Sequence, residues 1–217
     1  MEEVINEENC KRRTGYSMQE LFQLTGIFGV HKNYNYQTDW IYEVVISDRR
    51  VRVSIGDTPL LTELTRIIDL DTKDIDNALM DGRNRHRKGI GLEILESQVA
   101  YAKKDFEFLT IKAHRNDSDP NVTWTGYWQW GKYGYLMKTL DLQIFQSRVK
   151  NYIKAGHLKL NYKNMHLHEL LATEEGIEWW KVHGESWEGY FALGDESKSR
   201  ELLAAACIRR REKYPSN

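Results

Sequence analysis

Hydrophobic and polar residues alternate along the first third of the chain, in residues 42–46 and again in residues 51–55. A period of two is typical of strands that bury one face. The Asp48-Arg49 pair between the two segments suits a tight turn, so the pattern predicts a β-hairpin. Two further strands are predicted to follow, at residues 64–70 and 75–81. The first third is therefore expected to form an antiparallel meander.

The spacing of the apolar residues changes at Gly89. Apolar residues then recur every three or four positions, which predicts an amphipathic helix ending near Lys104. Residues 106–113 are rich in apolar and β-branched side chains and read as a strand. Strand, loop, helix and strand over residues 75–113 form a βαβ unit, whose two strands are expected to lie parallel.

The remaining sequence is mostly helical in pattern. Helices are predicted at residues 122–133, 141–154, 164–183 (a pair interrupted at Gly176) and 197–213, with a short strand at 190–193. Ser197 is the predicted N-cap of the last helix. The expected fold is α/β (α+β): a mixed, mostly antiparallel sheet with a central splayed parallel strand pair, flanked by helices.

Charge and cysteine content narrow the function classes. The 217 residues carry 31 Lys and Arg against 32 Asp and Glu, a formal charge of -1. Nucleic-acid binding through bulk electrostatics needs a basic excess, so it is disfavoured. Residues 1–13 are polar and charged, without the apolar stretch of a signal peptide, and no segment has the length of a membrane span. Two cysteines are too few for a disulfide framework, so a cytoplasmic protein is expected.

The strongest candidate for a binding site is the segment 81–92, which joins a predicted strand to a predicted helix. Two glycines and several cationic side chains stand there within a few positions. Amides at a helix N-terminus, the positive end of the helix dipole and close backbone approach at glycine together favour an anion such as pyrophosphate. The alternative is a tight turn beside a solvated basic loop. The segment has neither a Walker A ending nor three spaced glycines.

The segment His86-Arg87-Lys88-Gly89-Ile90-Gly91 resembles motif A of the GNAT acyltransferase superfamily, usually written Arg/Gln-x-x-Gly-x-Gly/Ala. The helix and strand that follow it, and the aromatic segment 127–135 that closes with Gly134-Tyr135, are similar to the next elements of that family. Residues 165–213 resemble an extension found on some bacterial and phage GNAT-like proteins.

Residues 1–16 are expected to form a polar tail. The resemblance implies an acyl-CoA-binding core at 17–140 and a helical extension at 141–217, packed on the core and supplying a last strand near 190–193. It further implies that acetyl-CoA is the co-substrate. A β-bulge is expected at about 79–81, where main-chain amides would meet the pantetheine and the thioester. The implied cofactor-binding residues are Leu79, Met80, Asp81, His86, Arg87, Lys88, Gly89, Ile90, Gly91, Leu92 and Trp130.

Two positions depart from the family pattern. His86 stands where Arg or Gln is usual, and Trp130 stands four residues before Gly134, the usual place of the tyrosine that protonates the leaving thiolate. Tyr127, about one turn earlier, is the predicted substitute. A carboxylate must also remove the amine proton, directly or through water. Asp76 is the predicted base, with two acids on the neighbouring strand, Asp69 and Asp71, as alternatives.

The leading hypothesis is an N-acyltransferase that moves an acetyl group from acetyl-CoA to a primary amine, either a small molecule or a protein. The rival is a catalytically weak or inactive GNAT-like protein that acts through protein–protein interaction. A third hypothesis is a nucleic-acid-binding protein, in which the basic loop and the clustered Trp124, Trp128 and Trp130 bind single-stranded nucleic acid. His166 and His168 are possible metal ligands, but two positions apart on a helix they would face different directions, so no metal is expected.

Overall fold

The computed structural model describes residues 3–30, 41–81, 89–115, 126–159 and 165–213. The chain divides into two compact units: unit 1 comprises residues 1–109 and 207–217, and unit 2 comprises residues 110–206. The division falls after Leu109, whereas the sequence placed the end of the core near residue 140. Within the described residues, no helix combines the length and apolar character needed to cross a bilayer.

Unit 1 is built on an antiparallel meander, as predicted. Its strands are β1 (Glu3–Val4), β2 (Ile41–Ser47), β3 (Arg50–Gly56), β4 (Glu63–Asp69) and β5 (Asp74–Asp81), each antiparallel to the next. Ser47 pairs with Arg50 across the predicted Asp48-Arg49 turn. Asp48 has a φ of 53°, a left-handed conformation that aspartate tolerates better than most residues.

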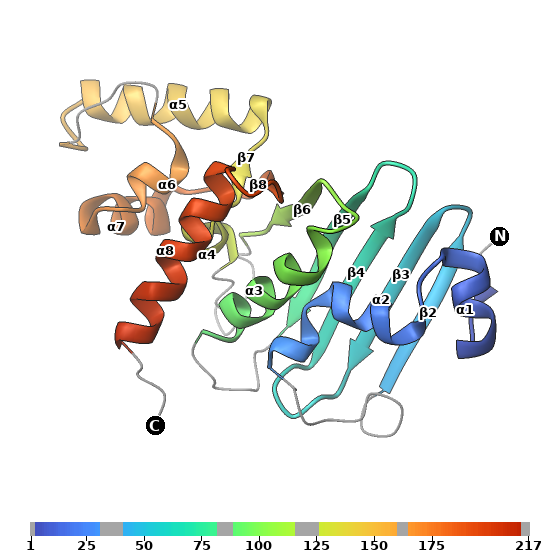
Figure 1. Cartoon of the computed structure of the whole chain (residues 1–217). Coiled ribbons are helices and arrows are strands. Elements are labelled where there is room, and N and C mark those ends of the chain that lie inside the picture. Colours follow the sequence, from blue (N-terminus) through green and yellow to red (C-terminus); the bar gives the residue numbers. More distant parts are fainter. Residues whose placement is uncertain (1–2, 31–40, 82–88, 116–125, 160–164, 214–217) are drawn as a thin grey trace. The chain divides into compact units, whose positions relative to one another are not determined.

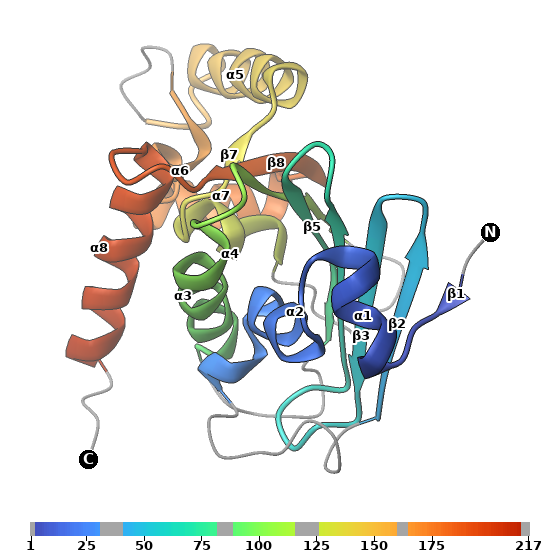
Figure 2. The same ribbon diagram turned by 45° about the vertical axis from the view of Figure 1, so that its right-hand side comes forward.

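Helices cover one face of this sheet (Figures 1 and 2). They are α1 (Glu7–Thr14), α2 (Met18–Thr25), the 3₁₀ turn η1 (Ile27–Gly29) and α3 (Ile90–Ala102). The covered face carries the alternating residues of the strands, including Val51, Val53 and Ile55, all fully buried. Full burial of one such side chain is worth about 1.5 to 3 kcal/mol, so this face is the main source of stability in unit 1.

Within the segment predicted as a polar tail at 1–16, the structure has strand β1 and helix α1. The Asn6 side chain accepts a hydrogen bond from the Asn9 amide at 3.1 Å and caps α1, and Gly15 ends the helix with a φ of 85°. Acidic residues begin the helix and basic residues end it, which suits the helix dipole. In the middle of α1, Cys10 is the one fully buried residue. The sequence therefore carries almost no hydrophobic stripe from which this helix could be predicted.

Strand β6 (Phe108–Ala113) follows α3 and lies beside β5 in the strand order. The amide of Glu107 donates to the carbonyl of Lys73 at 2.9 Å, so β5 and β6 begin side by side. Neighbouring strands that begin together and are joined by a crossover helix run in the same direction. The mixed α/β fold with its parallel pair is therefore confirmed.

Unit 2 contains the end of β6, α4 (Gly126–Lys132), β7 (Leu136–Met137), α5 (Thr139–Lys154), α6 (Leu167–Leu170), α7 (Glu174–His183), β8 (Trp187–Ala192) and the start of α8 (Lys198–Lys213). Strand β8 pairs antiparallel with β7 and lies beside β6. The predicted cap of α8 is confirmed, because the Ser197 hydroxyl accepts from the Arg200 amide at 3.3 Å.

The predicted helix pair at 164–183 does form, but the break is not at Gly176. The Thr173 hydroxyl accepts from the Gly176 amide at 3.0 Å, so Thr173 caps α7 and Gly176 lies in its first turn. A Cβ on Gly176 would lie 2.0 Å from the carbonyl oxygen of Leu170. This glycine therefore permits close approach of the preceding turn and does not interrupt a helix.

Candidate functional site

A β-bulge interrupts the pairing of β4 with β5. Thr65 pairs with Leu79 and Ile67 pairs with Asp76, so Asn77 and Ala78 together face the single residue Arg66. A bulge of this kind bends the strand and re-aims its side chains and amides. The sequence resemblance placed it at about 79–81. The bulge lies two residues earlier in β5, at Asn77–Ala78.

Arg66 lies opposite the bulge with only 1% of its surface exposed. One terminal nitrogen, Nη1, donates to the carbonyls of Thr65 at 3.0 Å and Leu79 at 2.8 Å. The second of these bonds ties β4 to the residue that follows the bulge. A buried guanidinium is costly to desolvate, and such hydrogen bonds offset that cost. Arg66 thereby stabilises the irregular path of β5.

The bulge is also attached to helix α3. The amides of Asn77 and Gln98 exchange two hydrogen bonds, at 2.9 and 2.8 Å, and both side chains are buried. Buried amides that satisfy each other favour one arrangement of strand and helix over others. The position of the bulge is thus coupled to the position of α3.

The first turn of α3, residues Gly89–Glu93, is called here the α3 head. Gly89 is its N-cap, with a φ of 83° and no side-chain hydrogen bond to the helix. The amides of Leu92 and Glu93 turn back to the Gly89 carbonyl at 3.1 and 3.2 Å. A first turn without a side-chain cap, at the positive end of the helix dipole, is suited to an anionic ligand.

The C-terminal end of α8 belongs to unit 1 and contacts the α3 head. Arg210 forms an ion pair with Glu93, and Arg211 forms one with Glu96 at 2.8 Å. A Cβ on Gly89 would lie 2.5 Å from Nε of Arg210. Gly89 is therefore required by its positive φ and also by this packing. The pairing with Arg210 counters the negative charge that Glu93 brings to the α3 head.

The described cofactor candidates of unit 1 lie on two elements, the end of β5 and the start of α3. Leu79 and Met80 are partly buried and Asp81 is buried, each paired with β4. Ile90 and Gly91 are partly exposed at the α3 head, whereas Leu92 is a core residue. His86, Arg87 and Lys88 lie outside the described residues.

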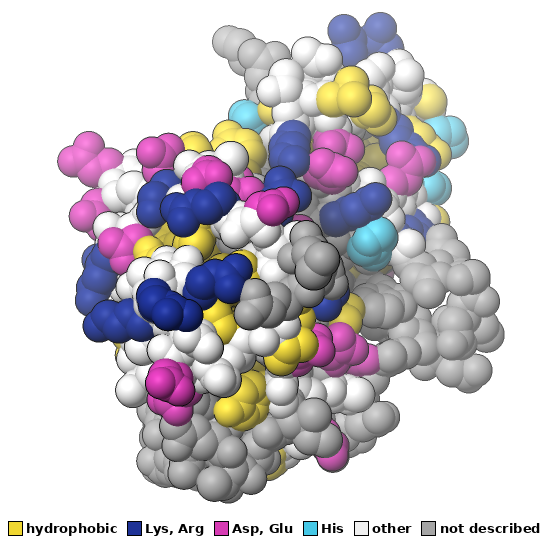
Figure 3. All heavy atoms as spheres, turned by 90° about the vertical axis from the view of Figure 1, so that its right-hand side faces the viewer, with side chains coloured by type: hydrophobic (Ala, Val, Ile, Leu, Met, Phe, Trp, Pro, Cys, Tyr) yellow, Lys and Arg dark blue, Asp and Glu magenta, His cyan; other side chains and the backbone are white. Residues whose placement is uncertain are grey.

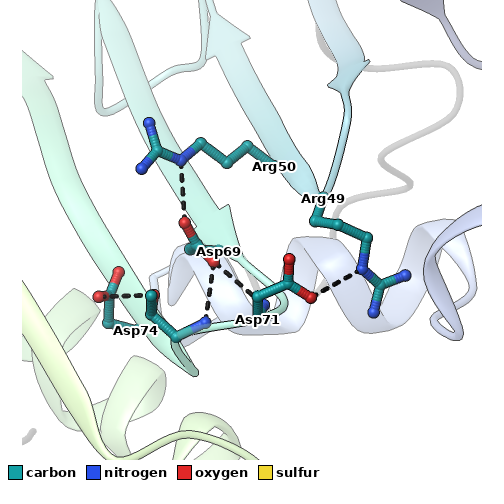
Figure 4. A network of polar contacts seen from close by, with 6 residues as sticks. Arg49, Arg50, Asp69, Asp71 and Asp74 are labelled. Atoms are coloured by element: carbon teal, nitrogen blue, oxygen red, sulfur yellow. Dashed lines mark hydrogen bonds and ion pairs between the residues drawn. The ribbon is translucent and has the colours of Figure 1, made fainter.

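Among the three predicted acids, Asp69 is the last residue of β4 and Asp71 lies in the turn before β5, at the end of the strand pair opposite to Asp81 (Figure 4). Asp69 accepts from the amides of Asp71 and Thr72, both at 3.0 Å, and from Nε of Arg50 at 2.9 Å. The Thr72 amide first, and then the Arg50 guanidinium, lower the pKa of Asp69 to about 2. Asp71 pairs with Arg49. Asp76 instead adjoins the bulge.

Replacing Asp69 by asparagine should therefore act on stability. Its side chain is 12% exposed, and the depressed pKa means that its contribution is present above about pH 4 and lost as the pH falls toward 2. We expect Asp69→Asn to cost about 1 to 2 kcal/mol at neutral pH, and the difference from wild type to shrink over that acidic window. Urea unfolding at a series of pH values measures this. Asp71→Asn, at an exposed ion pair, is the control and should change stability by less than about 0.5 kcal/mol at any pH. A D69N deficit that stays constant down to pH 2 would contradict the assignment.

Tyr127 and Trp130 belong to unit 2. The buried Tyr127 donates its hydroxyl to the carbonyl of Lys181 at 3.0 Å, and its own carbonyl accepts from the indoles of Trp180 at 3.2 Å and Trp187 at 2.5 Å. Trp130 makes edge-on contacts with Tyr133 and Tyr135. Both residues thus have packing roles within unit 2, and their catalytic and cofactor roles stay predictions.

The cysteines and the histidine pair have structural surroundings. Cys10 and Cys207 are buried, and burial raises the pKa of the Cys207 thiol to about 11 and also raises that of Cys10. His166 is the N-cap of α6 and not a helical residue, so its ring stacks on His168 with centroids 5.6 Å apart. The sequence argument that the two rings face different directions was therefore wrong. Over the part of the chain that the structure describes, no three His, Cys, Asp or Glu residues gather as metal ligands would.

Arg66, Asn77 and Gln98 are the residues of this site that the sequence analysis missed. A signal was present for Arg66, because it stands between Leu64 and Ile68 on the alternating face of a predicted strand. A charged residue on the buried face of a strand indicates either that the strand is irregular there or that the charge is buried against polar groups. Asn77 and Gln98 carry no local signal, since each is an ordinary polar residue until the two elements meet.

The chain matches no protein-family model, no curated protein and no solved structure. The GNAT resemblance thus gains no support from relatives and depends on the motif and on the geometry of unit 1.

Proposed function

We propose that the chain is a GNAT-like N-acyltransferase that transfers an acetyl group from acetyl-CoA to a primary amine. The observation that carries the proposal is the bulge at Asn77–Ala78, on the strand that leads to a glycine-started helix without a side-chain cap. A bulge exposes main-chain donors to a thioester carbonyl, and the α3 head offers amides to a diphosphate. The splay of β5 from β6, which would admit the pantetheine, is part of the proposal.

In the proposed reaction the amine nitrogen attacks the thioester carbonyl, the C–N bond forms and the C–S bond breaks. The amine must lose a proton, and the departing thiolate must gain one. Asp76 is the proposed base, acting directly or through water, because it adjoins the bulge, whereas Asp69 pairs with Asp74 at the start of β5 and Asp71 lies in the turn before that strand. The proposed phosphate contacts are the α3 head, Arg87 and Lys88.

Titration with acetyl-CoA tests the cofactor claim. We expect saturable binding by calorimetry, and we expect the double variant Arg87→Ala, Lys88→Ala to weaken it at least about tenfold, because charge-assisted hydrogen bonds to phosphate are lost. The matched control is Lys103→Ala, Lys104→Ala, which removes the same charge from the opposite end of α3 and should bind as wild type. Absence of binding by the wild type, or equal loss in both variants, would refute the proposal.

A second candidate is a GNAT-like protein that binds acetyl-CoA without appreciable turnover and acts through protein contacts. It is favoured by Trp130 at the usual tyrosine position and by the Tyr127 hydroxyl, which already donates to Lys181. Thiol release from acetyl-CoA with a panel of amines separates the two. Turnover that falls about tenfold or more in Tyr127→Phe supports the first candidate, and binding without turnover supports the second.

The surface drawn in Figure 3 gives no support to the hypothesis of nucleic-acid binding. Lys and Arg side chains there lie beside Asp and Glu side chains, so the described residues on that face carry charges of both signs. Neutralisation of several phosphates needs a region of one sign. The proposal therefore concerns a small charged cofactor.

A further inference from the structure

Unit 2 contains a cavity of about 420 Å³ that is widely open to solvent and whose lining is largely charged and polar. A volume of this order suits a small molecule. The cavity is lined by Arg115, Arg148, Val182, His183, Gly184, Glu185 and Ser186. None of these residues is proposed above to bind acetyl-CoA or to act in catalysis, and the inference below does not depend on the acyltransferase proposal, although Arg115 contacts Tyr127.

Arg115 is held rigidly at the cavity wall. Its Nη1 donates to the carbonyls of Val182 at 3.0 Å and Gly184 at 2.5 Å, and its amide donates to the Ser186 hydroxyl at 2.8 Å. The guanidinium also lies over the ring of Tyr127, 5.4 Å from the centroid. A cation oriented in advance loses little conformational entropy when a ligand binds.

The turn that holds Arg115 depends on Gly184. A Cβ at this position would lie 2.4 Å from the carbonyl oxygen of Trp180 and 2.6 Å from its ring. Only glycine lets the chain turn so closely at the end of α7, and this turn directs the carbonyls of Val182 and Gly184 toward Arg115. The wall of the cavity is thus a built feature and not a chance gap between side chains.

Arg148 supplies the second cation, from α5. It pairs with Glu185 at 2.5 Å, and the two side chains are 33% and 61% exposed. Among the described residues of the lining, Glu185 is the one carboxylate, so two arginines against one glutamate leave these residues a formal charge of +1. An exposed carboxylate can swing into water, which would leave Arg148 to an incoming anion.

His183 completes the lining, with its ring held by aromatic neighbours. It lies against Tyr152, with centroids 4.9 Å apart, and against Trp179 at 5.3 Å, and its Nδ1 is 3.4 Å from the Tyr152 hydroxyl. An imidazole can donate to an anion, and the Ser186 hydroxyl adds a further donor. These groups surround the two arginines with hydrogen-bonding partners of the kind that oxyanions require.

We propose that this cavity binds a small phosphate monoester, with Arg115 and Arg148 contacting the phosphate and Glu185 acting as a competing intramolecular anion. Guanidinium groups match the oxygens of phosphate in paired hydrogen bonds, which favours phosphate over a single carboxylate. The excess positive charge suits a ligand that is a mono- or dianion near neutral pH.

The test titrates the full-length protein with inorganic phosphate and with glycerol 3-phosphate at constant ionic strength, followed by NMR. We expect saturable binding, about tenfold weaker in Arg148→Gln because charge-assisted hydrogen bonds are lost, and several-fold tighter in Glu185→Gln because the competing carboxylate is gone. Arg200→Gln, which removes an arginine from another ion pair of unit 2, should bind as wild type.

The opposite signs expected for the two variants separate a ligand site from a merely structural ion pair. A structural pair would make Arg148→Gln and Glu185→Gln alike, with both destabilising and neither tightening binding. If Arg148→Gln does not fold, the tighter phosphate binding expected for Glu185→Gln still tests the proposal. The proposal is overturned by lack of saturation at about 20 mM of either phosphate probe, or by tighter binding of succinate than of glycerol 3-phosphate.

Discussion

Replacing Gly26 by alanine should lower the free energy of unfolding by about 3 kcal/mol or more, one of the two largest effects that we expect in unit 1. Gly26 has a φ of 82°, and a Cβ there would lie 2.2 Å from the carbonyl oxygen of Ile94 and 2.9 Å from Cβ of Gln98. The left-handed conformation costs a non-glycine residue about 1 to 2 kcal/mol, and overpacking adds about 1 to 3 kcal/mol. Helix α3 would have to move away from α2 and η1.

Gly15 provides a matched control for this experiment. It ends α1 with a φ of 85°, nearly the same conformation, but a Cβ there would meet nothing within 4 Å. Gly15→Ala should therefore cost only the conformational part, about 1 to 2 kcal/mol. Urea unfolding of both variants isolates the packing part as their difference. Equal losses would mean that α2 and α3 do not approach as closely as the structure has them.

The elements of unit 1 that sequence could predict are those with strong one-sided periodicity. Strand β3 alternates cleanly, β2 alternates except at Val45, and α3 carries an apolar stripe over more than three turns, so their types and approximate bounds were correct. Helix α1 was missed because its stripe is almost absent, and its caps, Asn6 and Gly15, were the only local evidence. Short helices of this kind depend on tertiary packing more than on propensity.

The candidate site was harder to predict than the fold. Gly89 and the helix start could be found from the sequence because glycine and the change of period are local signals. The bulge could be expected only from the GNAT resemblance, and its position is set by contacts between residues far apart in sequence, such as Arg66 with Leu79 and Asn77 with Gln98. These partners stand 13 and 21 positions apart, and nothing in the sequence pattern shows that they meet, so the register of the irregularity could not be predicted.

The same reasoning explains Gly176. In the sequence it reads as a break in a helix, because glycine is a poor helix former. In the structure it lies in the first turn of α7, where the absent side chain makes room for the carbonyl of Leu170. Whether a glycine interrupts a helix or admits a neighbour depends on what packs against it, which only the tertiary structure specifies.

Breaking the amide pair between Asn77 and Gln98 should produce the second large effect, a loss of about 2 to 4 kcal/mol for each single leucine substitution. Gln98→Leu removes both hydrogen bonds that Gln98 exchanges with Asn77, and Asn77→Leu removes the same two bonds from Gln98, while the remaining amide stays buried. The double variant places two apolar side chains together. Its loss in free energy of unfolding should be smaller than the sum of the two single losses by about 2 kcal/mol.

The double-mutant cycle is measured by urea unfolding, with a second cycle as its control. The hydroxyls of Ser54 and Thr65, 3.2 Å apart across β3 and β4, form a partly buried polar pair in the same sheet. The cycle of Ser54→Ala with Thr65→Val should give a coupling energy below about 1 kcal/mol, because water can replace a lost partner there. A coupling at Asn77 and Gln98 no larger than this would show that the amide pair does not hold the bulge to α3. If the coupling is large and the Asn77→Leu, Gln98→Leu double variant remains folded, weaker acetyl-CoA binding by that variant would tie the geometry of the bulge to the proposed function.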